Sequence, residues 1–203
     1  MTQLPDDAPE PRRALIVVDV QPTFCEDGEL PVAGGNAIAE RVAEYLRAHH
    51  DDYAVIATTQ DWHQDPGKHF SADPDYVDSW PPHGVVGTPN AELHPAIAAA
   101  IAGLAGVVRV RKGLHQAAYS GFEGTDQTGR SLAGVLADAA VDAVDVCGIA
   151  ESHCVKSTAI DAVKLGYPTT VLSDLTVPVS EELGIEAREE MSAAGVQSRP
   201  AIG

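Results

Sequence analysis

Five short apolar segments rich in β-branched residues recur along the chain, separated by segments with helical periodicity. The apolar segments span residues 14–20, 53–59, 106–112, 143–150 and 168–175. Their length and continuous hydrophobicity are typical of strands buried on both faces. The helical patterns cover residues 36–49, 93–102, 131–140, 152–165 and 180–194. This alternation predicts an α/β fold with an open, doubly wound, mainly parallel sheet and helices on both faces.

The size of the chain fits one domain of this kind. It has 203 residues, of which 44% are hydrophobic, enough to bury a full core. We expect a single domain over residues 13–203. The Pro-rich, acidic segment 1–12 is expected to be a flexible N-terminal tail.

The charge balance excludes two classes of partner. The chain has 13 Lys and Arg against 30 Asp and Glu, a net charge of −17, which repels nucleic acids and anionic membrane surfaces. Its longest apolar run, residues 14–20, is far shorter than the ~20 residues that span a bilayer. The N-terminus lacks the apolar core of a secretory signal. We therefore expect a cytoplasmic protein, and leave open whether it is a monomer or a homo-oligomer.

Polar side chains follow the ends of four of the expected strands. Asp19 ends the first, Asp61 and His63 follow the second, Lys112 ends the third, and the fourth leads to Cys154. Ligands bind beyond the carboxyl ends of the strands in such sheets. We expect these side chains to converge on one edge of the sheet.

Asp19 lies in the apolar context VVDVQ, where an ionised carboxylate needs a positive partner or hydrogen bonds. Lys112 is the candidate partner. The pair is either structural, joining two strands, or catalytic, and position alone favours neither reading.

The three cysteines differ in their surroundings. Cys154 follows Ser152, a good N-cap, so it is expected in the first turn of a helix, where amides and a nearby Lys favour the thiolate. The alternative is a small apolar residue packed beneath the helix. Cys147 lies within a strand and is read as structural, and Cys25 remains open. An odd number of cysteines argues against a disulfide framework.

Residues 60–92 show no sustained helix or strand pattern, and a loop this long in one domain is usually functional. It contains Asp61, His63, His69 and His83. Three imidazoles and a carboxylate suit a divalent transition metal. The alternative is a solvated polar loop. The histidines read as surface or loop residues are His49, His50, His94 and His115.

Five stretches in collinear order between residues 13 and 180 carry a family resemblance. They are ALIVVDVQPTFCEDGELPVAGG, TTQDWHQDPGKHFS, SWPPHGVVGTPNAELHP, RKGLHQAAYSGFEGTD and DVCGIAESHCVKSTAIDAVKLGY. Together they resemble the nicotinamidases, or pyrazinamidases, of the isochorismatase-like cysteine hydrolases.

The resemblance implies specific roles for residues of this chain. The implied catalytic triad is Asp19, Lys112 and Cys154, and the backbone amides of Ala150 and Cys154 form the implied oxyanion hole. The implied substrate-binding residues are Phe24, Trp80, Tyr119 and His153. The implied metal ligands are Asp61, His63, His69 and His83. The family also implies a cis peptide between Ile149 and Ala150.

The implied activity is hydrolysis of nicotinamide, and also of pyrazinamide, through a cysteine thioester in NAD salvage, with one divalent Fe, Zn or Mn ion. The rivals are another amidase or hydrolase of the same superfamily, and a non-catalytic metal- or ligand-binding protein on this fold. The chain departs from many members at Pro22, Thr23, Gly84 and the Glu151–Ser152 pair, which flank the site without altering an implied role, although Glu151 could change the pocket entrance.

Overall fold

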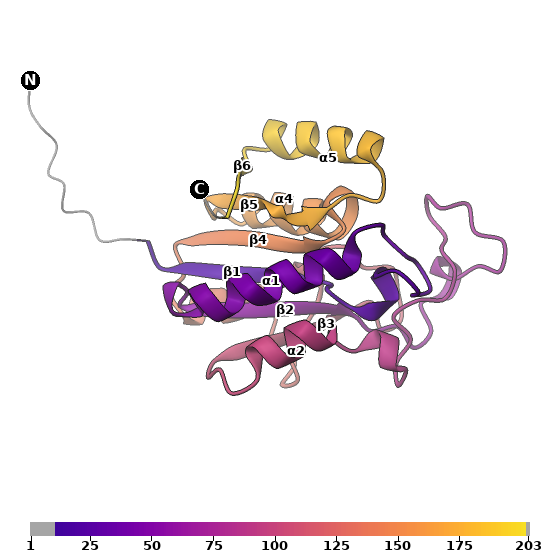
Figure 1. Cartoon of the computed structure of the whole chain (residues 1–203), viewed down its shortest axis with the longest axis horizontal. Coiled ribbons are helices and arrows are strands. Elements are labelled where there is room, and N and C mark those ends of the chain that lie inside the picture. The colour runs from indigo at the N-terminus through magenta and orange to yellow at the C-terminus, as the bar shows by residue number, and fades with distance from the viewer. Residues whose placement is uncertain (1–10, 202–203) are drawn as a thin grey trace, which may run out of the picture.

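Six parallel strands form one sheet in the order β3-β2-β1-β4-β5-β6 (Figure 1). The computed structural model describes residues 11–201. The strands are β1 (Arg13–Val18), β2 (Val55–Asp61), β3 (Val107–Lys112), β4 (Ala143–Ile149), β5 (Thr169–Val177) and β6 (Gln197–Arg199).

Helices cover both faces of the sheet. They are α1 (Gly35–His49), α2 (Pro95–Ile101), α3 (Leu132–Asp138), α4 (Lys156–Lys164) and α5 (Glu181–Ala193). Successive side chains of a strand point to opposite faces. Leu15 and Val17 pack with α1 and α2, whereas Ala14 and Ile16 pack with the other three helices. The doubly wound α/β prediction is confirmed.

Sequence signals account for the helix boundaries. The Ser131 hydroxyl accepts a hydrogen bond from Gly134 N at 3.2 Å, and Ser180 accepts one from Leu183 N at 3.2 Å. Both serines are therefore N-caps. The interior face of α1 is an apolar stripe that includes Ile38, Val42 and Leu46. The predicted bounds of α1 and α5 agree with the structure to within one residue, whereas α4 was predicted to begin at residue 152 and begins at Lys156.

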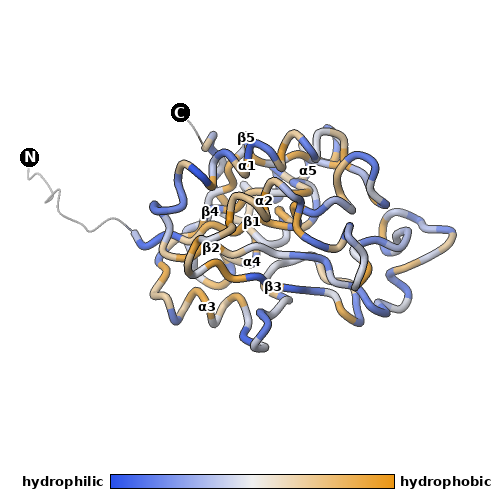
Figure 2. The backbone as a smooth tube through the Cα atoms, turned by 60° about the horizontal axis from the view of Figure 1, so that its bottom comes forward, coloured by the Kyte–Doolittle hydropathy of each residue, from blue (hydrophilic) through white to orange (hydrophobic). Residues whose placement is uncertain are grey.

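The strand bounds differ from the prediction by up to two residues, and one strand was not predicted. β2 extends through Gln60 and Asp61, two polar residues that hydrophobicity excluded but that are only 0% and 3% exposed. β6 was missed because its three residues are polar and exposed at the sheet edge. Figure 2 shows hydrophilic colouring along part of β3, where Arg109 and Arg111 lie. The predicted tail lies outside the described residues except for 11 and 12.

The order of the strands creates a crevice. The chain passes from β1 to β2 on one side, and later crosses from β3 to β4 on the other side of β1. Such a switch point is where open α/β sheets bind ligands. The loop between β2 and α2 extends past the carboxyl ends of the strands (Figure 1).

None of the helices within residues 11–201 is long and apolar enough to cross a membrane.

Candidate active site

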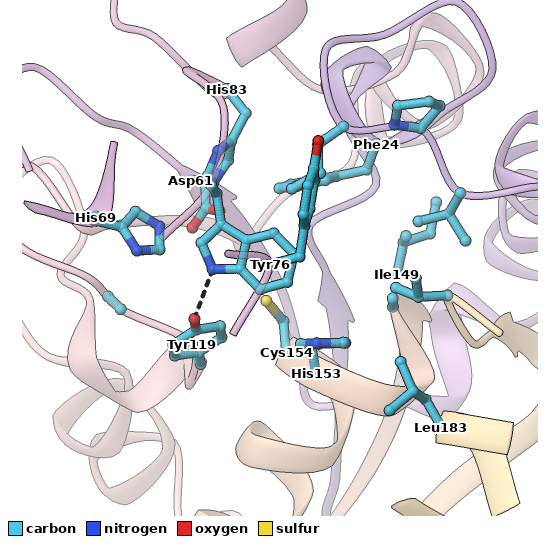
Figure 3. A pocket seen from close by; sticks show the side chains of 17 residues that line it. Phe24, Asp61, His69, Tyr76, His83, Tyr119, Ile149, His153, Cys154 and Leu183 are labelled. Atoms are coloured by element: carbon cyan, nitrogen blue, oxygen red, sulfur yellow. Dashed lines mark hydrogen bonds and ion pairs between the residues drawn. The ribbon is translucent and has the colours of Figure 1, made fainter. Parts of the chain in front are cut away.

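A cavity of about 420 Å³ lies at the carboxyl ends of β1, β2 and β4. Figure 3 shows Cys154 pointing into it, with His69, His83 and Asp61 on one side and Ile149 and Leu183 on the other. The residues that line it are Phe24, Leu30, Pro31, Val32, Asp61, His69, Tyr76, Trp80, His83, Ala118, Tyr119, Ile149, Ala150, His153, Cys154, Val179 and Leu183.

Asp19 follows β1 directly, with φ of 47°, and is fully buried. Its Oδ1 accepts a hydrogen bond from the Thr59 hydroxyl at 2.6 Å. Its Oδ2 lies 2.9 Å from Lys112 Nζ. The predicted pairing of Asp19 with Lys112 is confirmed.

Lys112, the last residue of β3, contacts Asp19, Asp61 and Cys154. Its Nζ pairs with Asp19 and Asp61, donates to the Ala118 carbonyl at 2.9 Å, and lies 3.8 Å from Cys154 Sγ. One ammonium thus contacts two buried carboxylates and a thiol. Removing it would leave two buried carboxylates without their cation.

Burial and charge shift the ionisation of this cluster in different directions. Burial raises the pKa of Asp19 above its ordinary value, against the opposing effect of Lys112. Burial would also raise the pKa of Asp61, but Lys112 and two histidines hold it well below its ordinary value. Although burial alone would lower the pKa of Lys112, Asp19 and Asp61 hold it well above its ordinary value. Asp19 is therefore a stronger base than an exposed aspartate.

Cys154 lies in a π-helical segment, Glu151–Val155, that leads into α4. Two expectations fail here. The N-cap is Ala150, because the Ser152 hydroxyl instead lies 2.9 Å from His153 Nδ1 and accepts a bond from Val179 N. The thiolate is not the favoured resting form, because burial raises the thiol pKa well above its ordinary value and outweighs Lys112. The surroundings of Cys154 therefore favour the neutral thiol over the thiolate.

The peptide that enters this segment has the expected geometry. The bond between Ile149 and Ala150 is cis, and Ala150 and Cys154 both line the cavity. Gly148 precedes them with φ of 116°, and a Cβ there would collide with the Val18 backbone. Glycine therefore lets β1 and β4 approach each other closely at the site. The oxyanion-hole assignment stays a prediction.

Three histidines of the β2–α2 loop form a cluster suited to a metal. One ring nitrogen from each of His63, His69 and His83 lies within 4.8 Å of the others. His63 Nδ1 lies 2.5 Å from the Gly113 carbonyl, and His83 Nδ1 lies 2.8 Å from the Pro81 carbonyl. Because a carbonyl can only accept, both Nδ1 atoms donate, which leaves the two Nε2 atoms as the positions that can bind a ligand.

The donor set around this cluster fits a divalent ion. His63 Nε2 and His69 Nδ1 are buried and have no hydrogen-bond partner among residues 11–201. Asp61 Oδ2 lies 3.6 Å from His63 Nε2 and 3.5 Å from His83 Nε2. Buried ring nitrogens without a hydrogen-bond partner are energetically costly unless a ligand binds them. Three imidazoles and one carboxylate match the preference of a divalent transition metal.

The predicted substrate-binding residues also come together. Trp80 Nε1 donates to the Tyr119 hydroxyl at 2.9 Å (Figure 3), and the Trp80 and His153 rings are 5.6 Å apart at 84°. The Phe24 ring lies 5.7 Å from that of His83. All four line the cavity, so an aromatic ring between Cys154 and the histidines would be enclosed by aromatic surfaces.

Sequence reasoning missed the residues that support the site. Gln21, fully buried, accepts from Asp61 N at 2.8 Å and donates to the carbonyls of Asp61 and Ala91 at 3.0 and 2.7 Å. Thr59, two residues before Asp61, orients Asp19. Thr23 accepts a bond from Gly84 N at 3.1 Å. The available signal was a polar side chain within a buried strand or directly after one.

Three further residues stand out in the sequence, Cys25, Cys147 and Glu151. Cys25 and Cys147 are buried and do not line the cavity, and burial raises the pKa of the Cys25 thiol to about 11. Glu151 does not shape the entrance, because its carboxylate is buried and pairs with Arg188 at 2.7 Å.

Comparison with known proteins agrees with this geometry. A family model described as "Isochorismatase domain" matches residues 13–199. A Nicotinamidase/pyrazinamidase of Mycobacterium tuberculosis is 50% identical over 186 residues, covering 91% of this chain and 97% of that protein. A nicotinamidase of Acinetobacter baylyi is 36% identical over 91% of this chain and 90% of its own length.

Solved structures show the same fold. A pyrazinamidase of Pyrococcus horikoshii in complex with zinc has a TM-score of 0.80 and 36% identity, covering 94% of this chain and 99% of that one. A yeast nicotinamidase bound to the inhibitor nicotinaldehyde has a TM-score of 0.80 and 28% identity, covering 93% and 99%. The chain belongs to the isochorismatase domain family.

Proposed function

We propose that this protein is a nicotinamidase that hydrolyses nicotinamide to nicotinate and ammonia, accepts pyrazinamide as well, and serves NAD salvage. The observation that carries the proposal is the thiol of Cys154, placed beside Lys112 and facing a buried cluster of three histidines across one cavity. The names of the relatives at 50% and 36% identity support the same activity.

The chemistry begins with proton transfer. Asp19, a strengthened base, takes the proton of the Cys154 thiol, and the sulfur attacks the carboxamide carbon. Lys112 stabilises the anionic sulfur as it forms, and the amides of Ala150 and Cys154 hold the oxyanion. Asp19 then returns the proton to the leaving nitrogen, and ammonia departs.

The thioester is hydrolysed by the reverse use of the same groups. Asp19 takes a proton from water, the resulting hydroxide attacks the thioester carbon, and the C–S bond breaks to give nicotinic acid, which loses its proton to the solvent as nicotinate. The proton returns to Cys154. The overall reaction consumes one water for each amide bond broken.

Binding and orientation come from the other side of the cavity. Asp61, His63, His69 and His83 would hold a divalent ion, Fe, Zn or Mn, which supplies a Lewis-acid contact for the pyridine nitrogen. Phe24, Trp80, Tyr119 and His153 would enclose the ring. This arrangement places the carboxamide at Cys154 and lowers the entropic cost of attack.

Ammonia release by protein of measured metal content tests the proposal. We expect turnover of nicotinamide and pyrazinamide, and little of an aliphatic carbamoyl compound such as N-carbamoylglycine. Preference for the carbamoyl compound would favour another amidase of the superfamily. Nicotinamide binding without ammonia release would favour a non-catalytic binding protein.

A further inference from the structure

A buried carboxylate lies beside the reactive part of the site without facing the cavity. Glu151 follows Ala150 directly and precedes Cys154 by three residues. It is 3% exposed and opens the Glu151–Val155 segment. Its Oε2 lies 2.7 Å from Nη1 of Arg188 on α5. Glu151 does not line the cavity, whereas its neighbours Ala150 and Cys154 do.

The position of Glu151 has an electrostatic cost for the reaction. The amides at the start of a helix carry partial positive charge, which favours an oxyanion there. A carboxylate at the first residue of the segment opposes that charge. By Coulomb's law, an uncompensated charge about 10 Å from an oxyanion changes the stability of that oxyanion by roughly tenfold at an effective dielectric constant of about 20.

Arg188 is placed to remove this cost. Its two terminal nitrogens each lie 2.7 Å from a carboxylate, one of Glu151 and one of Glu181. Gly184 makes room for the guanidinium, because a Cβ there would lie 3.1 Å from Arg188 Nη1 and 2.9 Å from the Pro178 ring. Burial raises the pKa of Glu151, and Arg188 opposes that rise. The fold therefore accommodates a specific cation on α5.

We propose that Arg188 is a charge-compensating positioning residue: its pairing with Glu151 shields the oxyanion at Ala150 and Cys154 from a buried negative charge. This inference rests on the proposed function, because it requires an oxyanion at that position. It assigns a catalytic contribution to α5, which touches no reacting atom.

Four variants distinguish charge compensation from a purely structural role of the Glu151–Arg188 ion pair. Assayed at a pH that keeps the unpaired Glu151 ionised, Arg188→Met should lower kcat/KM for nicotinamide about tenfold. Glu151→Gln removes the charge and should stay within about threefold of the unmodified protein. The double variant should recover most of the loss caused by Arg188→Met. Glu181→Gln, the matched control, keeps the Glu151–Arg188 pair and should change little.

A purely structural role of the ion pair predicts a different pattern of activities. Glu151→Gln and Arg188→Met would then be equally impaired, and the double variant would be no better than either. That pattern overturns the proposal. Thermal unfolding of all variants establishes that each is folded at the assay temperature.

A second measurement is independent of turnover. Nicotinaldehyde (pyridine-3-carboxaldehyde) should add to Cys154. A C–S bond forms, the carbonyl π bond breaks, and the oxygen receives the negative charge or the thiol proton. Its dissociation constant should rise about tenfold in Arg188→Met and recover in the double variant. Equal dissociation constants, or no binding to the unmodified protein, contradict the inference, whereas missing ammonia release with this binding pattern contradicts only the proposed function.

Discussion

The two halves of the site are held in different ways. The strand-end half, Asp19, Thr59 and Lys112, lies in or directly after strands, and its charged groups meet partners on neighbouring strands. The loop half, His63, His69 and His83, comes from the β2–α2 loop, and two of its ring nitrogens have no partner among residues 11–201. The strand-end half is complete as folded, whereas the loop half has the ligand atoms to hold a divalent ion.

The loop half depends on how the loop is closed. Gln21 and Gln60 both donate to the Ala91 carbonyl, at 2.7 and 2.9 Å, near the end of the loop. Gln21 also binds the backbone of Asp61, where the loop begins. The positions of the histidines therefore depend on a buried contact between the loop ends and the strands, and the variants below test each half separately.

The largest effect is expected at the nucleophile between the halves. Cys154→Ala should lower turnover at least 1000-fold on every substrate, because no other group can form the thioester. Ammonia release measures it, and the unfolding temperature should change by only a few degrees. Cys25→Ala and Cys147→Ala are the controls and should remain active. An alanine variant at 154 with a tenth of the native rate would contradict the thioester mechanism.

The loop half should affect substrates selectively. His83→Ala should lower kcat/KM for nicotinamide about 100-fold or more, since orientation through the ring nitrogen is lost. Benzamide has nearly the same shape without that nitrogen, so its turnover should change far less. The two proteins are compared by thermal unfolding first, because the loop also carries Trp80. An equal loss for both amides would mean that the metal acts at the carbonyl or on water.

The contact of Gln21 with the two ends of the β2–α2 loop should control metal affinity. Gln21→Leu removes three hydrogen bonds at Asp61 and Ala91, and zinc affinity should fall about 10- to 100-fold. Competition with a chelator measures the dissociation constant. Gln60→Leu is the matched control, because it loses the Ala91 bond and leaves Asp61 held. Similar affinities for the two variants would show that Gln21 does not position Asp61.

The smallest effect is a pH dependence specific to the loop half. Burial and the neighbouring His83 and His63 lower the pKa of His69 to about 4, against about 6.5 when unfolded. The unfolded chain thus binds more protons between these values, so stability rises with pH across this window and is lost as pH falls. The unfolding temperature of metal-free protein should drop from pH 6.5 to 4. His69→Asn should show a shallower drop, and identical curves would refute the assignment.

The fold and the reactive residues were accessible from the sequence for a physical reason. Buried strands and helical stripes leave periodic hydrophobic patterns, and Asp19, Lys112 and Cys154 are polar or reactive groups in apolar surroundings. The roles of Gln21 and Thr59 were not accessible, because their contacts join residues 40 positions apart. The protonation of Cys154 was misjudged because local signals, a helix start and a lysine, do not report burial.

The neutral thiol has a consequence for durability. Peroxides and other oxidants attack thiolates, and the irreversible sulfinic and sulfonic acids are reached through that first oxidation. Cys154 is only 8% exposed, and burial raises its thiol pKa well above the ordinary value, so the reactive thiolate is scarce between turnovers. Peroxide should therefore inactivate this protein more slowly than hydrolases with a permanently ionised cysteine.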